Sequence, residues 1–156
     1  MVDFYIEPLS SAQLDIEGML AAQWRHTGEP EIECKPNWKF YRQMNEIGAC
    51  MVIMARRDDV PVGYLAAFIY PHFNSVDHLI ASIPTYFVKE GPGRALILVS
   101  LVDFAIQQLA DRGVIRVDID TNAENSAGRL WELKGFKLAK LGYSLKLKRA
   151  SETRNA

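Results

Sequence analysis

Cysteine is scarce in this sequence, and neither sign of charge is in clear excess. The two cysteines, Cys34 and Cys50, form no spaced disulfide framework, which favours a reducing compartment. The 18 basic and 19 acidic residues give a formal net charge of -1, so no global field attracts nucleic acid or an anionic membrane. No apolar run is long enough to span a bilayer, and residues 1–4 lack the features of a signal peptide. We therefore expect a cytoplasmic protein that binds neither nucleic acid nor a membrane.

Several signatures of catalysis and of modular organisation are missing as well. The histidines His26, His72 and His78 lack metal-site spacing with either cysteine, so we expect no metal. There is no Gly-x-Ser-x-Gly elbow and no phosphate-loop lysine. Repeats, linkers and low-complexity segments are also absent. A length of 156 residues with 49% hydrophobic residues then predicts one mixed α/β domain over residues 1–149, followed by a disordered tail at 150–156.

The most informative stretch that is present runs from residue 79 to residue 113. It predicts a buried strand at 79–88, a turn at 91–94, and a helix from 95 to 112. The helix is apolar on nearly every face, so we expect it to be buried, and a strand at 114–121 follows it directly. The first amides of a helix lack intrahelical partners, and Gly91 and Gly93 let the backbone approach a ligand. The turn is therefore a candidate anion site.

Weaker patterns predict the remaining elements around this unit. The chain begins with a strand at 4–9 and a helix that runs from the capping-box pair Ser10 and Gln13 to about Arg25, followed by a loop at 26–36. A second helix is capped by Asn37 and stopped by Gly48, and strands at 50–56 and 62–70 are joined by a turn at 58–61. The remaining elements are a loop at 71–77, a short helix at 127–133, and a strand or hairpin over 136–148. One face of the first helix would carry Leu14, Gly18, Ala21 and Ala22. In the second helix, Trp38, Tyr41 and Met44 share one side.

Two separated stretches point to one family. The first is YFV at 86–88 followed by GPGRAL at 91–96, and the second is NAENSAGRLWELKGF at 122–136. Together they resemble the GNAT superfamily of acyl-CoA N-acyltransferases, whose second segment reads "N…A..LY..xGF". The predicted order of elements is similar to the GNAT fold over nearly the whole chain. The loop at 70–73 and the strand after it are similar to a GNAT subgroup found in phages and prophages.

The resemblance implies an α+β mixed sheet in which the central strand splays from the next parallel strand and admits the pantetheine arm of acetyl-CoA. Residues for the pantetheine would be Phe87 and Val88. The pyrophosphate would lie on the turn, and the thioester end would be flanked by the second segment. The residues implied for these two parts are Gly91, Gly93, Arg94 and Ala95 for the pyrophosphate, and Asn122 or Asn125 with Trp131 for the thioester end.

The chemistry that the resemblance implies needs a base for the amine, an oxyanion donor and an acid for the thiolate. By period two, His78, Ser82, Pro84 and Tyr86 would share one face of the central strand. Ser82 and His78 are the candidate catalytic residues on it. The alternatives are that Ser82 is an ordinary hydrogen-bonded strand hydroxyl and that His78 is a surface residue at the start of the strand. Tyr143 is a candidate acid, because Trp131 stands where the family has tyrosine and an indole N–H is too weak an acid. Aromatic and histidine side chains near the open side of the cleft would line the acceptor pocket. They are Trp24, His26, Trp38, Tyr41 and Tyr143.

Three hypotheses remain open. The first is an N-acetyltransferase that moves an acetyl group from acetyl-CoA to a primary amine of a small molecule or protein by direct attack. The second is a GNAT-fold protein with weak or no turnover that binds CoA or a partner protein. Trp131 favours this hypothesis, and so does the turn at 91–94, which is shorter than the usual turn of the family. The third is a dinucleotide-binding unit, which fails because Leu96 replaces the third glycine and only one strand–helix–strand unit is present. A homodimer is an assembly that the sequence leaves open.

Overall fold

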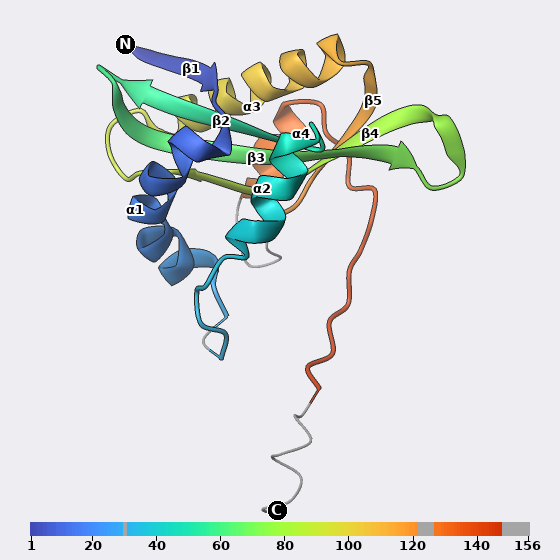
Figure 1. Cartoon of the computed structure of the whole chain (residues 1–156), viewed down its shortest axis with the longest axis horizontal. Coiled ribbons are helices and arrows are strands. Elements are labelled where there is room, and N and C mark those ends of the chain that lie inside the picture. The colour runs from blue at the N-terminus through green and yellow to red at the C-terminus, as the bar shows by residue number, and fades with distance from the viewer. Residues whose placement is uncertain (30, 122–126, 148–156) are drawn as a thin grey trace, which may run out of the picture. The chain divides into compact units, whose positions relative to one another are not determined.

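The computed structural model describes residues 1–29, 31–121 and 127–147 (Figure 1). The chain divides into two compact units, Met1–Asn122 and Ala123–Ala156, which are described in turn. The expectation that residues 1–149 form one domain stays a prediction. Within the described ranges, no helix combines the length and the apolar character needed to cross a bilayer.

The first unit is built on a five-stranded mixed sheet with the order β1-β2-β3-β4-β5. The β1–β2, β2–β3 and β3–β4 pairs are antiparallel, whereas β4 and β5 are parallel. This confirms the predicted mixed sheet and its strand–helix–strand unit. The strands are β1 (Val2–Ile6), β2 (Cys50–Arg57), β3 (Val60–His72), β4 (Ser75–Val88) and β5 (Val114–Ile119).

The two hairpins differ in how well the sequence predicted them. Asp58 and Asp59 both have positive φ, 50° and 64°, and form the predicted turn between β2 and β3. The predicted loop at 71–77 is wrong, because His72 pairs with Ser75 and only two residues connect β3 to β4. Pro71 is tolerated in β3 because Cys50, the first residue of β2, pairs with Phe68. The residues of β3 after Phe68 therefore pair with β4 on one edge and have no β2 partner on the other.

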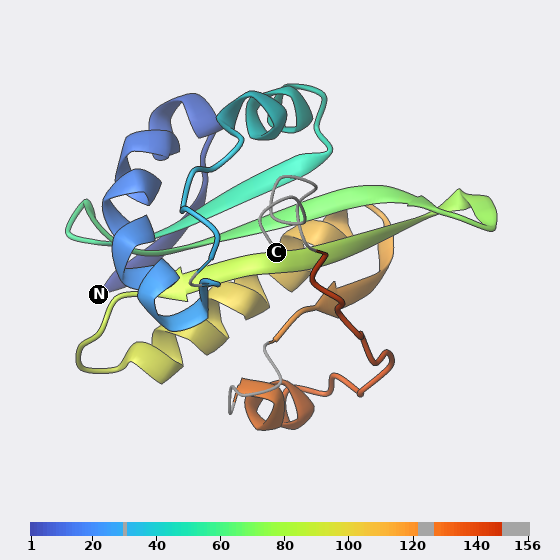
Figure 2. The same cartoon turned by 90° about the horizontal axis from the view of Figure 1, so that it is seen from below.

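Helices cover both faces of this sheet, with α1 (Leu9–Thr27) and α2 (Trp38–Glu46) on one face and α3 (Arg94–Asp111) on the other (Figure 2). Helix α1 buries a stripe at helical spacing, formed by Leu9, Ala12, Ile16 and Met19. The predicted face of α1 is wrong, since Leu14 is 79% exposed. The buried stripe, with Leu9, Ile16 and Met19, offers more apolar side-chain surface to the core than the predicted face, where Leu14 is the single large side chain.

The ends of α1 and α2 are set in different ways. Pro8 occupies the N-cap of α1 without a side-chain cap, so the capping box predicted from Ser10 and Gln13 is wrong. Proline suits this position because its fixed φ and missing N–H cost little at a helix start. Helix α2 begins as predicted, with the Asn37 side chain accepting a hydrogen bond from the Phe40 N–H at 3.1 Å. Trp38, Tyr41 and Met44 pack against the core, as predicted.

Helix α3 is buried along one face only. Ile97, Leu101 and Ala105 are buried on the side against the sheet, whereas Leu96 is 72% exposed. The expectation of burial on nearly every face is therefore wrong, because the sheet covers a single side of the helix. Phe104 of α3 stacks on Phe4 of β1 with ring centroids 6.0 Å apart, which fixes the helix across the sheet.

An ionic cluster joins β2 to α1 and to Glu7, the residue that directly follows β1, at one corner of this unit. The Arg56 guanidinium donates from Nε and Nη2 to the two oxygens of Glu7, at 2.6 Å and 2.8 Å. Nη2 also donates to Asp15 at 2.7 Å, and Nη1 to the Asp59 carbonyl at 3.2 Å. The Arg56 and Glu7 side chains are each only 16% exposed, so these charges are paired away from most of the solvent.

The second unit contains α4 (Ala127–Leu133) and a segment without helix or strand over residues 136–147. The short helix is confirmed, and Gly135 ends it with a φ of 91°. The strand or hairpin predicted for 136–148 is wrong over the described residues. Leu141, Tyr143, Leu145 and Leu147 alternate as in a strand, yet all are at least 73% exposed. Alternation alone does not make a strand, because a strand also needs a hydrogen-bonding neighbour.

Candidate functional site

The turn before α3 has the conformation that its glycines predict. Gly93 is the N-cap of α3 in the left-handed region with φ 75°, and Gly91 has φ 148°. A Cβ added at either glycine would meet nothing within 4 Å, so the backbone conformation and not lack of space requires glycine here. Arg94 and Ala95 are exposed, and the Arg94 Cζ atom lies 6.0 Å from the centre of the Phe87 ring. The Arg94 N–H donates to the Gly91 carbonyl at 3.3 Å, and the exposed start of α3 presents one guanidinium to solvent.

Strand β4 loses its parallel neighbour before it reaches that turn. The pairs between β4 and β5 run from Leu79 with Val114 to Ile83 with Ile119. Strand β4 continues to Val88, and along this second half it pairs with β3 on its other edge. This is the splayed central strand of the predicted fold, and among the described strands no other pairs with its open edge.

The backbone of β4 changes phase at the same place. Ser82 pairs with Phe68 and Thr85 with Ala66, so Ile83 and Pro84 together stand opposite the single residue Ala67. This is a β-bulge, which inserts one extra residue and shifts the alternation of faces. The predicted shared face of His78, Ser82, Pro84 and Tyr86 is therefore wrong beyond Ser82.

Beyond the bulge, Thr85 and Phe87 take over the face that Ser82 occupies. Residues directly opposite in a sheet share a face, and Ser82, Thr85 and Phe87 pair with alternate residues of β3. Those partners lie on the side of α1, since Tyr64 and Ala66 belong to the same core cluster as α1. His78 is on this face too, but it lies four residues before Ser82, which is about 13 Å along a strand.

A polar network that sequence reasoning missed lies on this face. Gln23 of α1 donates from Nε2 to the Thr85 hydroxyl at 2.9 Å, and the Tyr64 hydroxyl donates to Gln23 Oε1. Burial raises the pKa of Tyr64 to about 12, so its phenol stays protonated at neutral pH. A signal for Gln23 was present in the sequence, because it extends the buried stripe of α1 at helical spacing as its only polar member.

The residues predicted to line the acceptor pocket lie in different surroundings. Trp38 and Tyr41 pack against the core, with ring centroids 6.0 Å apart, and burial raises the pKa of Tyr41. Trp24 is half-buried, and its ring lies where a Cβ on Gly28 would be. His26 Nε2 lies 3.5 Å from a Glu90 carboxylate oxygen, so the end of α1 reaches the residue before the glycine turn. Of the four predicted lining residues in the first unit, Trp24 and His26 therefore extend beyond the core cluster.

Two predicted site residues, Trp131 and Tyr143, lie among the described residues of the second unit. Trp131 is buried and packs edge-on against Phe136, with ring centroids 6.3 Å apart. Tyr143 is 94% exposed in the segment without regular structure. Asn122 and Asn125 lie outside the described residues. The contribution of these four residues to the site stays a prediction.

Comparison with known proteins places the fold. No protein-family model matches the chain, and none of the curated proteins matches it. Solved structures do match, among them a ribosomal-protein-alanine N-acetyltransferase from Brucella melitensis biovar Abortus 2308, with 17% identity, a TM-score of 0.70 and coverage of 95% of this chain and 100% of that one. An aminoglycoside acetyltransferase from an uncultured soil metagenomic sample, in complex with sisomicin, matches with 13% identity, a TM-score of 0.72 and coverage of 95% and 96%.

A third match is described as a transcriptional regulator from Bacillus halodurans C-125, with 21% identity, a TM-score of 0.69 and coverage of 94% of this chain and 100% of that one. The chain has the fold of the GNAT acetyltransferases, which confirms the predicted resemblance at the level of the fold. The finer likeness to a phage subgroup stays a prediction.

Proposed function

We propose that this protein is an N-acetyltransferase that moves an acetyl group from acetyl-CoA to a primary amine. One observation carries the proposal: the parallel ladder ends at Ile83, while β4 continues to Val88 and leads into the glycine turn of α3. An open strand edge and an anion-binding helix start thus follow one another along a single segment. A long cofactor with amide groups and a pyrophosphate matches this order of features.

The backbone direction of β4 indicates which residue would hold the pantetheine amides. The Lys89 N–H donates to the Val62 carbonyl of β3 at 2.8 Å. Backbone groups alternate along a strand, so Phe87 also faces β3, whereas Val88 turns its N–H and C=O toward the edge that β5 leaves. Val88 would therefore bind the arm through its backbone, and Phe87 would support it through its buried ring.

The groups for the pyrophosphate fit the exposed turn. Gly91 and Gly93 bring backbone close to a ligand without a side chain, and Arg94 stands at the first helical position. Pro92 offers no N–H, so the donors would come from the start of α3 and from Arg94.

For the acyl transfer, Ser82 and Thr85 are the polar side chains of β4 on either side of the bulge. Ser82 stays a candidate catalytic residue for removing the amine proton, directly or through water. Thr85 is held by Gln23, which is itself held by Tyr64, so this hydroxyl has a fixed orientation. The high pKa of Tyr64 makes it a hydrogen-bond donor at neutral pH and excludes it as a base.

We propose direct transfer without an acyl-enzyme. A base or water takes one proton from the ammonium, the neutral amine nitrogen forms a bond to the thioester carbon, and the carbon–sulfur bond breaks. The nitrogen then releases a second proton to water and becomes the amide, while the leaving thiolate takes up a proton from water. Cys50 is buried, and burial raises its pKa to about 11, which keeps its thiol protonated and a poor nucleophile. Mass spectrometry after incubation with acetyl-CoA alone should show no acetyl adduct on cysteine. An adduct formed at the rate of turnover, with a folded but inactive Cys34→Ala, Cys50→Ala variant, would overturn direct transfer.

Calorimetric titration with acetyl-CoA tests the cofactor site. Gly93→Glu places a negative side chain against the pyrophosphate, so we expect affinity to fall by tenfold or more, that is by about 1.4 kcal/mol or more. Gly113→Glu is the matched control, because Gly113 also has a positive φ, 84°, and open space around it, but lies at the other end of α3. Both variants carry similar backbone strain. Equal affinities in the two folded variants would show that the turn does not bind the cofactor.

A second candidate is a GNAT-fold protein that binds CoA without efficient turnover. Trp131 favours it, because the indole replaces the family's phenol and is buried against Phe136. Turnover assays should include a peptide with an N-terminal alanine, and sisomicin. The matched structures are a ribosomal-protein-alanine N-acetyltransferase and an aminoglycoside acetyltransferase in complex with sisomicin. Tight acetyl-CoA binding with no acetylation across a broad amine panel would favour the second candidate.

A further inference from the structure

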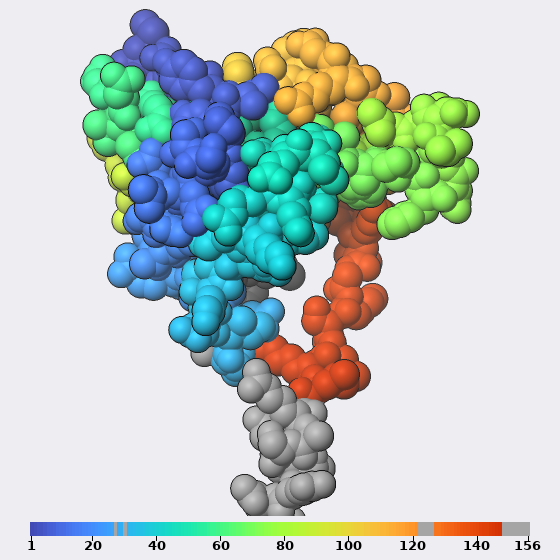
Figure 3. Space-filling view, in the orientation of Figure 1, coloured from blue at the N-terminus to red at the C-terminus, as the bar shows by residue number. Residues whose placement is uncertain are grey.

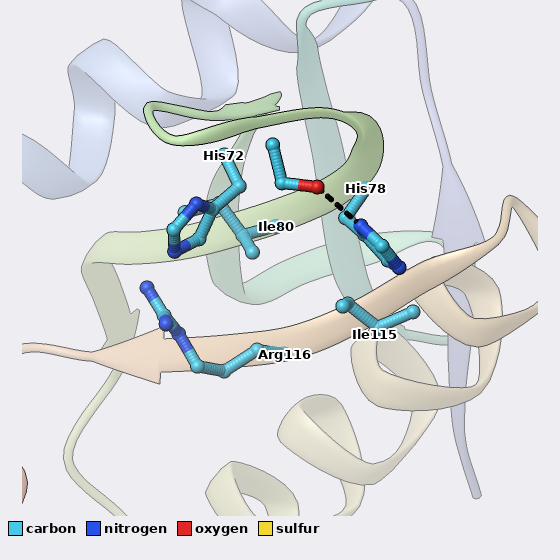
Figure 4. Close-up of a pocket in the computed structure, with 6 residues that line it drawn as sticks. His72, His78, Ile80, Ile115 and Arg116 are labelled. Atoms are coloured by element: carbon cyan, nitrogen blue, oxygen red, sulfur yellow. Dashed lines mark hydrogen bonds between the residues drawn. The ribbon is translucent and has the colours of Figure 1, made fainter.

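A groove of about 520 Å³ lies at the end of β4 opposite to the glycine turn. It is lined by His72, Ser75, His78, Ile80, Ile115 and Arg116, which come from three adjacent strands (Figure 4). Helices α1 and α2 cover the sheet beside it, but the tip of the β3–β4 hairpin extends past α2 (Figure 3). All six lining residues belong to the first unit. The proposed acetyl transfer uses none of them except the catalytic candidate His78.

The two imidazoles present hydrogen-bond donors to this groove. The Asn74 N–H donates to His72 Nδ1 at 3.1 Å, so Nδ1 must be unprotonated and the ring proton is on Nε2. His78 Nδ1 lies 2.5 Å from the Ser75 hydroxyl, which anchors the ring on the opposite side of the groove. In Figure 4 the His72 ring and the Arg116 guanidinium extend toward the same space. The groove therefore combines two imidazole rings with one fixed cation.

Arg116 is held in a way that leaves it suited to a ligand. Its Nε lies 3.3 Å from Asp118 Oδ1 and its Nη2 lies 3.4 Å from Oδ2, so the carboxylate takes up one edge of the guanidinium. A guanidinium has five N–H donors, and the fork formed by its two terminal nitrogens can receive a second oxyanion. The Arg116 side chain is 44% exposed, so a ligand can reach it from solvent.

The floor and one wall of the groove are apolar because of a second irregularity in the sheet. Leu79 pairs with Val114 and Ile80 with Arg116, so Ile115 is an extra residue in β5. Neighbours on a regular strand point to opposite faces, but here Ile115 and Arg116 both line the groove. Ile80 is buried beneath them. An apolar surface next to a cation suits a ligand with a carbon skeleton and an anionic group.

The lining residues distinguish an anion from a metal ion. None of the six is acidic, and Asp118 reaches the groove only through its contact with Arg116. Over the ranges that the structure describes, no three His, Cys, Asp or Glu side chains gather to hold a metal. We propose that this groove binds the oxyanion of a small molecule, a phosphate or a carboxylate, through Arg116, His72 and His78.

Imidazole NMR signals of the full chain test this proposal, because the protein has three histidines and two of them line the groove. Sodium phosphate and sodium acetate are titrated separately at pH 7, with sodium chloride keeping the ionic strength constant. We expect a saturable shift of the His72 and His78 signals with at least one of the two anions. The anion that saturates at the lower concentration identifies the phosphate or the carboxylate source.

Variants decide whether the response comes from the groove. In Arg116→Gln the apparent affinity should fall about tenfold or more, since a charge-assisted fork is lost. In Arg57→Gln, an exposed arginine at the far end of β2, it should not change. His26 reports separately on anion binding at the glycine turn, because it lies near that turn through Glu90. The proposal is overturned if no signal shifts, if only His26 shifts, if chloride alone reproduces the shifts, or if Arg116→Gln binds as the wild type does.

Discussion

Two arginines of the same sheet, Arg56 and Arg116, are placed in opposite ways. Arg56 is 16% exposed and donates to two carboxylates and one carbonyl, which come from the β1–α1 connection, α1 and the β2–β3 turn. Arg116 is 44% exposed and lies beside the Asp118 carboxylate, two residues along its own strand. The first guanidinium joins separate elements, whereas the second is oriented locally and faces an open groove.

This difference teaches how to separate structural charge from binding charge. Removing a partner from a buried ionic cluster leaves other charges without compensation, whereas an exposed pair contributes little to stability. A guanidinium such as that of Arg116, which is oriented by one carboxylate on one edge, can bind a ligand through the N–H donors of its other edge. Stability and binding should therefore respond in opposite ways to substitution of these two arginines.

The largest expected effect is on the structural side of the comparison. Arg56→Met keeps much of the volume but leaves the Glu7 and Asp15 carboxylates without their cation. We expect the free energy of unfolding to fall by about 3 kcal/mol in urea titrations. Arg57→Met, at the exposed neighbouring position, should change it by less than about 0.5 kcal/mol. Similar small losses in both variants would show that the Arg56 cluster is not a structural tie.

A second prediction asks whether an uncharged buried network behaves like the Arg56 cluster. Burial raises the pKa of Tyr64 from 10.0 to about 12, so between these values the folded protein keeps a proton that the unfolded chain loses. Stability from this group is complete below pH 10 and is lost as the pH rises toward 12, by about 2–3 kcal/mol in total.

The measurement is the difference in unfolding free energy between wild type and Tyr64→Phe at pH 8, 10 and 11.5. The difference isolates Tyr64, because Cys50 has a raised pKa in both proteins. The advantage of the wild type should shrink as the pH rises. A difference that stays constant would mean that the phenol is not shielded from solvent.

The smallest expected effect completes the comparison. Arg116→Gln should change the free energy of unfolding by less than about 0.5 kcal/mol, because its pair with Asp118 is exposed and local. Urea titration beside Arg56→Met checks this directly. If Arg116→Gln lost as much stability as Arg56→Met, the two arginines would be alike, and loss of anion binding in that variant could not be assigned to the groove.

The part of the fold nearest the proposed cofactor site was the most predictable. Gly91, Gly93 and the apolar helix after them form a local pattern, and the structure places that helix start within one residue of the prediction. The cap of α2 by Asn37 is local in the same way. Local patterns are readable because the hydrogen bonds they predict join residues only a few positions apart.

Features that depend on distant residues could not be predicted. Arg56 contacts Glu7 and Asp15 across 49 and 41 positions of sequence, and Tyr64 meets Gln23 across 41. The alternation in 141–147 is a strand pattern that lacks a strand partner in the described structure. The inward face of α1 was misjudged because two stripes compete, and only the packed sheet decides between them.

The bulge in β4 also governs how this protein can tolerate genetic change. Ile83 and Pro84 together occupy the place of one residue, so the count of residues, more than their identity, decides which side chains face α1. Deleting one of them would move Thr85 and Phe87 away from Gln23 and Tyr64 and restore a regular ladder. In a library of variants, the exposed position 84 should accept many substitutions and the buried position 83 only apolar ones, whereas a one-residue deletion at either should be rejected. Drift by point mutation and drift by insertion or deletion are therefore under different constraints at this strand.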